Sequence, residues 1–424
     1  MLHLLYDNKN SKTKRIPFLY HLPVVVCLFF AFILINYCNS QPANMGNSDN
    51  AWVGAWSTAP QLVEPRNMPP EPGLTNNTLR QVVCVSLGGD SLRVRFSNEF
   101  STSAVKMRAV HLALSVGESK IDTGTDQAIK FNGNTEVTIE PGKAITSDPF
   151  LFKVKPRSLL AITIYYGDTS PDVTGHPGSR TTSYIMPGNH ISDLEMPEAA
   201  TTDHWYTING IDIIAPDAKA VVVLGNSITD GRGSGTNKQN RWPDELAKRL
   251  LANPDTRNVA VLNLGIGGNC VLRQCLGPSA LDRFERDVLN QYNVHWLIIL
   301  EGINDIGQAH GSEGSGKVAS DLIHAYIQMI DSAHTKNMLV YGATLLPFGG
   351  SFYDSPDHEK ARTTVNEWIR TSGRFDAVID LEAALRDPSN PLQLLPAADT
   401  GDHLHPNENG HRMMGEAVDL NLFN

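Results

Sequence analysis

The spacing of apolar residues changes at about position 216 and divides the chain into two regions. From Trp52 to about residue 203, short β-branched and apolar segments are separated by turn-forming residues, a pattern typical of antiparallel strands. The period of two is clearest where Leu92, Val94 and Phe96 alternate with arginines. Since few stretches here show helical spacing, we predict an antiparallel β-sandwich of the jelly-roll type for residues 41–215. The expected strands are residues 81–87, 91–96, 107–114, 136–139 and 159–166.

Beyond about Pro216, strand-like apolar runs alternate with amphipathic helical segments. This alternation predicts βαβ units, right-handed crossovers and a parallel sheet. Residues 216–424 are therefore expected to form an α/β domain. The expected strands are residues 221–224, 259–264, 296–300, 339–343 and 377–381. The expected helices are residues 243–251, 281–290, 318–336 and 359–371, with a last helix beginning near Gly410.

Residues 1–40 have the layout of an export signal. Basic residues at positions 9–15 precede an apolar run to about residue 37, and the small polar residues Asn39 and Ser40 follow it. We expect cleavage near Ser40 and a periplasmic, cell-surface or secreted protein. The run is almost long enough to cross a bilayer, which leaves a retained anchor as one alternative. Lipidation of Cys38 is another, although the bulky Tyr37 before it fits that modification poorly.

The composition narrows the possible partners. With 424 residues and ample apolar content, the chain is long enough for two globular domains. A formal charge of -10 and the lack of a basic stripe argue against a nucleic-acid partner.

In an oxidising compartment Cys270 and Cys275 are close enough in sequence to form a disulfide, which leaves Cys84 as a buried thiol. A metal site would need more thiols or histidines at short spacing, so none is expected.

Four polar segments share one location in the predicted α/β domain. Ser227 follows the first strand, residues 263–269 follow the second, and residues 301–305 follow the third. Residues 402–407 lie directly before the last helix. Because ligands bind at the carboxyl edge of such sheets, we expect all four segments to meet there.

The residue types in these segments fit acyl transfer to a serine nucleophile. The Ser227 hydroxyl needs a base to take its proton, and histidine is the usual base near neutral pH. We assign His405 as this base, with Asp402, three residues earlier, orienting the ring and stabilising the imidazolium. The N–H groups of Ser227 and Gly268 and the amide of Asn304 are the expected donors to the oxyanion.

The same segments, in the same order, resemble the motif blocks of the SGNH (GDSL-type) hydrolase family over about residues 218–423. The resemblance implies a flavodoxin-like three-layer fold, a serine nucleophile, an acyl-enzyme intermediate and no cofactor. Asn226 departs from the family's usual aspartate, and we expect activity to survive with a changed pH dependence or acyl preference. The matching blocks are Gly225-Asn226-Ser227-Ile228, Asn263-x-Gly265-x-x-Gly268, Gly302-Ile303-Asn304-Asp305 and Asp402-x-x-His405-Pro406.

Three further stretches are similar to a two-domain branch of this family found beside xylan-degrading enzymes. They are residues 52–56, 241–244 and 276–280. The branch implies an exported esterase, such as an acetylesterase, that acts on acylated plant polysaccharide or small esters. A lipase or arylesterase of the same family is the alternative. Apart from the export signal or anchor, no membrane partner is expected.

Competing assignments exist for several of these residues. Asn304 could instead cap the helix that follows it, and Gly267 competes with Gly268 for the role of oxyanion donor. His403 is the rival of His405 as the base, although the spacing to Asp402 and the Pro-Asn that follows favour His405.

Other chemistries fit the sequence less well. A metal centre made of Asp399, Asp402, His403 and His405 would leave the serine and asparagine of the other segments without a role. His411 is expected to face solvent from the last helix.

Other protein classes lack their signatures. The G-x-S-x-G elbow is absent around the predicted nucleophile, the glycines at 231–235 lack phosphate-loop spacing, and residues 265–268 do not complete a dinucleotide fingerprint. A non-catalytic carbohydrate-binding protein would present aromatic rings to sugars. The candidates for such rings are expected to lie in the core or at a domain interface instead; they are Trp52, Trp56, Trp205 and Tyr206.

Overall fold

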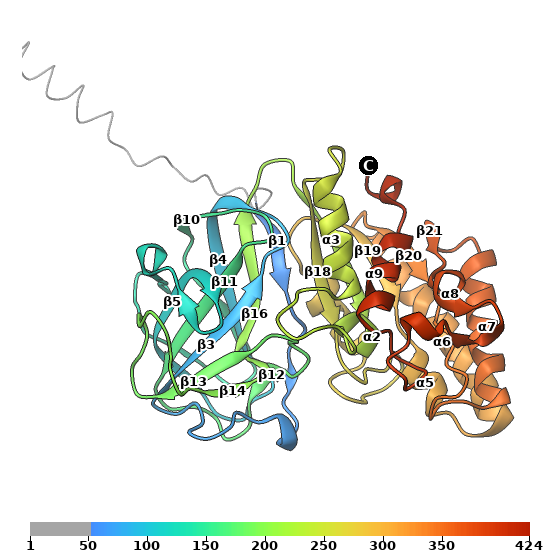
Figure 1. The fold of residues 1–424 in the computed structure, drawn as a ribbon, viewed down its shortest axis with the longest axis horizontal. Coiled ribbons are helices and arrows are strands. Elements are labelled where there is room, and N and C mark those ends of the chain that lie inside the picture. Colours follow the sequence, from blue (N-terminus) through green and yellow to red (C-terminus); the bar gives the residue numbers. More distant parts are fainter. Residues whose placement is uncertain (1–51) are drawn as a thin grey trace, which may run out of the picture. The chain divides into compact units, whose positions relative to one another are not determined.

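Antiparallel sheets make up the first region of the chain (Figure 1). The structure is a computed structural model and describes residues 52–424. The strands are β1 (Trp52–Ser57), β2 (Gln61–Leu62), β3 (Asn77–Cys84), β4 (Gly89–Asn98), β5 (Val105–Gly117), β6 (Lys120–Ile121), β7 (Gln127–Ala128), β8 (Val137–Ile139), β9 (Lys143–Thr146), β10 (Phe150–Val154), β11 (Leu159–Tyr166), β12 (Thr174–His176), β13 (Ser183–Pro187), β14 (Ala200–Thr202), β15 (Trp205–Tyr206) and β16 (Ile208–Ile214). One sheet has the order β1-β16-β4-β10, a second the order β14-β13-β3-β11-β5-β6, and a small third sheet the order β15-β12-β2.

The expected strands of this region are present, with shifted ends, and β11 matches its prediction in full. The sequence pattern missed the other strands of this region, the longest of which are β1, β10, β13 and β16. The strands β1 and β16 pair with each other and bury nearly all of their residues. A strand buried on both faces has no period of two, so alternation could not reveal it. The jelly-roll arrangement of the sheets stays a prediction.

Five parallel strands form the sheet of the second region. They are β17 (Lys219–Gly225), β18 (Val259–Gly265), β19 (Val294–Leu300), β20 (Leu339–Ala343) and β21 (Ala377–Ile379), and a hairpin of β22 (Arg386–Asp387) and β23 (Asn390–Leu394) follows them. Their order, β18-β17-β19-β20-β21, is the 2-1-3-4-5 order of flavodoxin-like sheets. The predicted parallel α/β sheet is therefore confirmed, with β17 in its interior.

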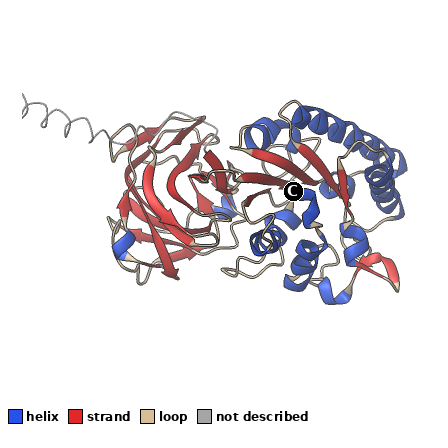
Figure 2. Cartoon of the chain, turned by 90° about the horizontal axis from the view of Figure 1, so that it is seen from above, coloured by secondary structure: helices blue, strands red, loops and turns tan. Residues whose placement is uncertain are grey.

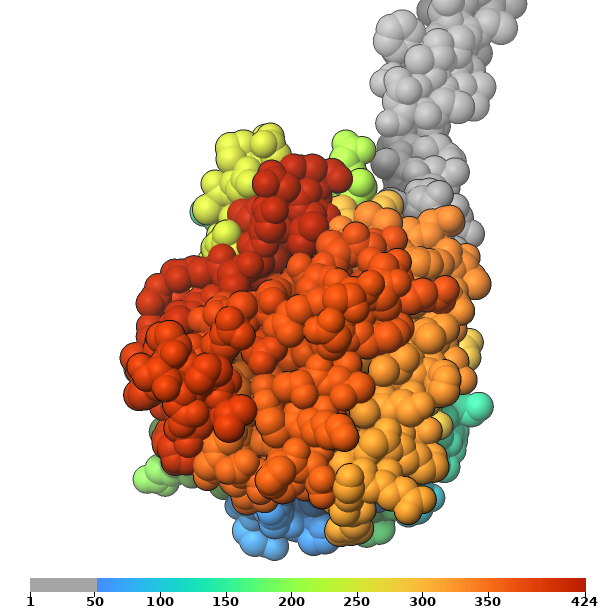
Figure 3. Space-filling view, turned by 90° about the vertical axis from the view of Figure 1, so that its right-hand side faces the viewer, coloured from blue at the N-terminus to red at the C-terminus, as the bar shows by residue number. Residues whose placement is uncertain are grey.

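Helices cover both faces of this parallel sheet (Figure 2). They are α2 (Ser227–Asp230), α3 (Trp242–Ala252), α4 (Ala280–Phe284), α5 (Ile303–Gly307), α6 (Gly311–His334), α7 (Pro356–Thr371), α8 (Leu381–Leu385) and α9 (Glu408–Ala417). The helix α3 packs against α9, and α6 packs against α7. Segments from the last third of the chain, coloured orange to red, cover the face shown in Figure 3.

Three predicted elements of the second region have different bounds. The helix α6 starts at Gly311 rather than at residue 318. The sequence pattern missed its first turns because they are rich in glycine and serine and lack an apolar stripe. The helix predicted for residues 281–290 divides into α4 and a π-helical turn, Glu285–Leu289. The strand predicted for residues 377–381 stops at Ile379, because the side chain of Asp380 caps α8 by accepting a hydrogen bond from Ala383 N.

One hydrophobic core runs through both regions. The strand β1 packs on β18, where a Cβ atom at Gly54 would lie 2.7 Å from Leu262 Cδ1. Ser86 Oγ also accepts a hydrogen bond from Val261 N at 3.0 Å. The two regions are therefore joined by packing and by hydrogen bonds, and the described residues 52–424 form one compact unit. The boundary between residues 215 and 216 stays a prediction.

The aromatic residues considered as a sugar-binding surface are all buried. Trp56 and Trp205 pack edge to face within the core, with ring centroids 5.0 Å apart. Trp52 and Tyr206 are buried as well, so none of the four presents a ring face to solvent. Their assignment to the core is confirmed.

The predicted export signal, the cleavage near Ser40 and the lipidation of Cys38 all lie outside the described residues. Within residues 52–424, no helix combines the length and the apolar character needed to cross a membrane.

Candidate active site

Ser227 lies at the carboxyl end of the strand β17. The strand ends at Gly225, and Asn226 caps the short helix α2 by accepting a hydrogen bond from Ile228 N at 3.1 Å. Gly231 ends this helix with φ +102°, a conformation that glycine adopts without strain. The turn holds the Ser227 hydroxyl at the edge of the sheet where α/β proteins bind their ligands.

The loop before α9 brings a histidine to this serine. Ser227 Oγ lies 2.9 Å from His405 Nε2, and His405 Nδ1 lies 2.7 Å from Asp402 Oδ2. The other carboxylate oxygen of Asp402 accepts the N–H groups of Leu404 and His405 at 3.0 and 2.8 Å. Because the Nδ1–H group donates to the carboxylate, Nε2 is available to accept the serine proton.

Two of the predicted oxyanion donors line the same cleft as the serine. Gly268 has φ +73°, and Asn304 is buried in α5. Asn304 Nδ2 donates to Asn269 O at 2.7 Å, and Asn304 Oδ1 accepts from Tyr353 Oη at 3.1 Å. Since Nδ2 carries two hydrogens, one N–H of the Asn304 amide remains for an oxyanion.

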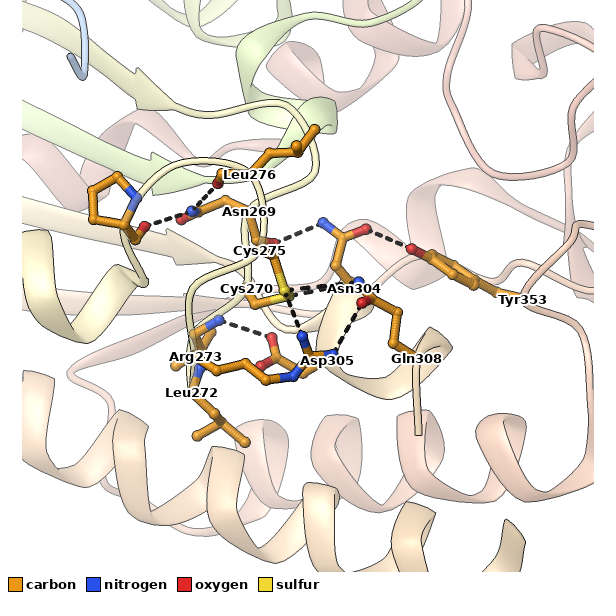
Figure 4. Close-up of a disulfide and its surroundings, with 12 residues drawn as sticks. Asn269, Cys270, Leu272, Arg273, Cys275, Leu276, Asn304, Asp305, Gln308 and Tyr353 are labelled. Atoms are coloured by element: carbon orange, nitrogen blue, oxygen red, sulfur yellow. Dashed lines mark hydrogen bonds between the residues drawn. A yellow bond between two sulfur atoms is a disulfide. The ribbon is translucent and has the colours of Figure 1, made fainter. Parts of the chain in front are cut away.

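A disulfide braces the loop that follows Gly268 (Figure 4). Cys270 and Cys275 are bonded, with their Cα atoms 5.6 Å apart. The carboxylate of Asp305, on α5, accepts the N–H groups of Val271 and Leu272 at 2.8 and 3.0 Å. The loop is tied both to itself and to α5, so the two donors keep one position relative to each other.

A cleft of about 410 Å³ contains these groups, and both regions of the chain form its walls. The second region contributes Ser227, His405 and Asn304, whereas the first region contributes Glu64 and Arg180. Loops from the first region therefore shape the site.

A buried pair joins the first region to the turn that carries the nucleophile. His176 Nε2 lies 2.9 Å from Asp230 Oδ1, and His176 Nδ1 lies 2.9 Å from Ala59 O. Both ring nitrogens thus face oxygen atoms that can accept a hydrogen bond. The two side chains are 3% and 2% exposed, so the contact fixes the last residue of α2 against the first region.

Burial and hydrogen bonding set the charges of His405 and Asp402. Burial lowers the pKa of the His405 imidazole; Asp402 opposes this effect, and the positive charges of Arg232 and Arg180 add to it. Burial alone would raise the pKa of Asp402, but the N–H groups and the ring of His405 outweigh it and lower the pKa. Near neutral pH the imidazole is therefore neutral and the carboxylate ionised, as a general base and its partner require.

Comparison with protein families agrees with this geometry. The profile of the GDSL-like Lipase/Acylhydrolase family matches residues 223–413. This part of the chain belongs to that family. The GDSL-like domain contains Ser227, His405, Asp402 and Asn304, and membership implies an ester hydrolase. No curated protein matches the chain.

Several solved structures are similar to a part of this chain. An acetylxylan esterase from Geobacillus stearothermophilus is 20% identical with a TM-score of 0.36, over 47% of this chain and 91% of that one. A GDSL-like lipase from Bacteroides thetaiotaomicron is 19% identical with a TM-score of 0.34, over 47% of this chain and 85% of that one. The family profile, rather than these likenesses, identifies the domain.

The structure separates the competing assignments within the GDSL-like domain. Asn304 does not cap α5, because Gly302 occupies the N-cap position. His403 pairs with Asp399, with 2.7 Å between Nδ1 and Oδ2. The histidine that contacts Ser227 is His405. Among the residues that the structure describes, no group of three or more His, Cys, Asp or Glu side chains could hold a metal ion. Gly267 and Gly268 both line the cleft, so their competition remains open.

The prediction for His411 is wrong. Its ring is fully buried between α9 and α3, where Nδ1 accepts a hydrogen bond from Trp242 N at 3.2 Å and Nε2–H donates to Arg232 O at 3.0 Å. Burial lowers the pKa of His411 to about 4, so the ring is neutral at physiological pH. The residue lies on the same helical stripe as Met414, which places it in the core rather than in solvent.

Asn226, where the family usually has aspartate, is buried beside the carboxyl group of Glu301. Burial raises the pKa of Glu301 well above its usual range, while Arg283 and the Asn226 side chain oppose the rise. An aspartate at position 226 would place a second carboxyl group beside Glu301. The neutral amide avoids that repulsion and still caps α2.

Sequence reasoning missed Tyr353, His176 and Arg180 as parts of this site. Tyr353 forms a hydrogen bond with Asn304, which is 49 positions away in the sequence. His176 forms one with Asp230, which is 54 positions away. No motif or periodicity marks such pairs, since the contacts depend on how distant loops pack.

We expect Tyr353→Phe to lower kcat about 2- to 10-fold, the range of one neutral hydrogen bond. The hydroxyl fixes which way the Asn304 amide points, and its ring lies over Gly307, where a Cβ atom would come within 2.2 Å of Tyr353 Cγ. Steady-state kinetics on a 4-nitrophenyl ester measures the change. If Tyr353 acts through Asn304, the substitution costs nothing further in an Asn304→Ala background; full additivity would contradict this role.

The acid limb of kcat/KM should be centred below about pH 6.5, the usual pKa of an imidazole. The base must be neutral, and burial lowers the pKa of His405, so activity rises through that lowered pKa and persists into mildly acidic solution. Arg232→Gln removes a positive charge that favours the neutral ring, so its acid limb should shift to higher pH. A wild-type limb centred above pH 6.5 would contradict the burial argument.

Proposed function

We propose that the chain is an exported serine esterase that removes acetyl or other short acyl groups from plant-type polysaccharide or from small esters. The observation that supports this most is the hydrogen-bonded row of Ser227, His405 and Asp402. Such a row is what attack of a hydroxyl on an ester carbonyl requires. The family of residues 223–413 supports hydrolysis of acyl esters, and the resemblance to a branch found beside xylan-degrading enzymes supports the polysaccharide.

In the proposed mechanism, His405 Nε2 takes the proton of Ser227 as Oγ attacks the ester carbonyl. The Ser227 and Gly268 N–H groups and the Asn304 amide donate to the developing oxyanion, while Asp402 stabilises the imidazolium. The C–O bond to the alcohol then breaks, and His405 gives its proton to the leaving oxygen. Water, deprotonated by the same imidazole, attacks the acyl-enzyme, releases the acid and restores the serine.

The lining of the cleft supports a polar alcohol over a long-chain lipid. A long acyl chain needs a deep apolar pocket, whereas Gln61, Glu64, Asn67 and Arg180 line this cleft. At the same cleft, Phe352 is 75% exposed and presents an apolar ring of the kind on which a sugar can stack.

Export is part of the proposal and rests on the composition of residues 1–40. The disulfide between Cys270 and Cys275 is compatible with an oxidising compartment. We also propose that the first region is a jelly-roll-like β-sandwich domain whose role at the site is to form one wall of the cleft.

Acetate release tests this function. The substrates are acetylated xylan, other acetylated glycans, and 4-nitrophenyl esters of short and long acids. We expect release from a glycan and preference for short acyl chains. A pronounced preference for long chains would favour a lipase, and glycan binding without turnover of any ester would favour a carbohydrate-binding protein.

A further inference from the structure

Three arginine side chains, Arg66, Arg180 and Arg232, line the cleft that holds Ser227 and His405. The chain as a whole is acidic, with a formal net charge of -10. The cleft therefore contains three positively charged side chains, although the net charge of the whole chain is negative. Cationic walls raise the local concentration of anions and orient them as they approach.

The acidic residues of the cleft already have partners within the protein. Glu64 accepts hydrogen bonds from Gln61 Nε2 at 2.7 Å and from Asn67 Nδ2 at 2.9 Å. Asp230 pairs with His176 at 2.9 Å. Glu64 and Asp230 Oδ1 therefore bind neighbouring side chains, whereas Asp230 Oδ2 accepts no hydrogen bond and faces Arg180.

The donors of Arg180 and Arg232, in contrast, remain available. Arg180 Nη2 lies 3.6 Å from Asp230 Oδ2, and Arg232 Nε lies 3.9 Å from Asp402 Oδ2, distances at which charges attract but no hydrogen bond forms. The two side chains are 31% and 62% exposed. Both guanidinium groups can therefore reach a ligand in the cleft.

The position of His405 indicates where the alcohol part of an ester would lie. His405 must protonate the leaving oxygen, so the alcohol part of an ester lies next to His405. The Arg232 side chain lies beside Asp402. The backbone N–H of Arg232 donates a hydrogen bond to the backbone oxygen of Ser227 at 2.8 Å, which fixes the Arg232 main chain next to the nucleophile. The positive charges of Arg232 and Arg180 both act on His405. The oxyanion donors Gly268 and Asn304 come from other segments, the loop after β18 and the helix α5.

We propose that the alcohol part of the substrate carries a carboxylate, as in an acylated glycan that contains uronic acid residues, and that Arg180 and Arg232 bind this carboxylate. A guanidinium group presents a planar fork of donors that matches a carboxylate. The inference rests on the proposed function and narrows its substrate to an acidic glycan. The arginines then act as specificity-determining residues, because they contact the sugar rather than the ester bond.

The test compares an O-acetylated methyl glucuronoside as the free acid with its uncharged methyl ester. At about pH 8 and low ionic strength, where the carboxylate is ionised and screening is weak, we expect wild-type kcat/KM to favour the acid by about tenfold. Arg232→Gln and Arg180→Gln should each reduce this preference, the ratio of kcat/KM on the acid to kcat/KM on the methyl ester, by about threefold or more. The matched control is Arg257→Gln, an exposed arginine away from the cleft, which should leave the preference unchanged.

The outcomes separate this inference from the proposed function. Turnover of 4-nitrophenyl acetate without any preference for the free acid would overturn the inference and leave the esterase standing. No turnover of any of these esters would overturn the proposed function itself. Arg232 is largely exposed, so its variant should fold, and an unchanged preference in that variant would overturn the role of the arginine. A greater preference for the acetyl ester of glycerol phosphate would replace the carboxylate by a phosphate.

Discussion

Replacing Ser227 by alanine is expected to lower kcat by roughly 10⁴- to 10⁶-fold, the scale of removing a nucleophile from a serine triad. The hydroxyl lies 2.9 Å from His405 Nε2, and no other atom of the side chain can form the acyl-enzyme bond. The remaining activity would come from the oxyanion donors and from substrate binding. Acetate release measures the loss, and a mass increase of the intact protein after rapid quenching should appear in the wild type alone.

Ser389→Ala is the matched control for this change. Ser389 is an exposed serine outside the cleft, so its replacement removes the same hydroxyl without touching the site. We expect its kcat to equal that of the wild type. A Ser227→Ala variant that keeps its fold and turns over at a comparable rate would show that the nucleophile lies elsewhere.

Asn304→Ala is expected to lower kcat by about 10²- to 10³-fold and to change KM little, as for other side-chain donors to an oxyanion. The negative charge forms only in the transition state, so the lost hydrogen bond acts on the chemical step rather than on binding. Pre-steady-state kinetics on 4-nitrophenyl acetate should show slower acylation. A rise in KM with unchanged kcat would instead mean that Asn304 binds the ground state.

The amide of Asn304 also donates to Asn269 O, so the substitution needs a test of the loop. The disulfide and Asp305 hold the same loop independently. The variant should therefore keep its thermal unfolding midpoint within a few degrees, since one buried hydrogen bond contributes about 1 kcal/mol. A large drop in the midpoint would assign the lost activity to the fold.

The sequence predicted the parallel sheet and the meeting of Ser227, His405 and Asp402 because local rules govern both. An apolar run that stops at a glycine marks the end of a buried strand, and parallel strands end at one edge of their sheet. Residues placed directly after such strands must come close to one another. The short spacing between Asp402 and His405 predicted their contact in the same way.

The remaining parts of the site depend on contacts that no local rule describes. Tyr353 reaches Asn304 from a loop without a motif, and Arg180 comes from a different region of the chain. His411 was misplaced because a single polar residue on an amphipathic helix is usually solvated, whereas here two backbone groups satisfy its ring nitrogens inside the core. Such partners become visible only when the packing is known.

The packing of β1 on β18 has a consequence for how the chain is made. The first region leaves the ribosome before β18 exists, so the residues that will cover β1, such as Leu262, are still missing. Until they arrive, the apolar side of β1 has no neighbour and is open to wrong associations. Final assembly must therefore wait for the second half of translation. An oxidising compartment would then allow the Cys270–Cys275 bond to close once the second region has been made.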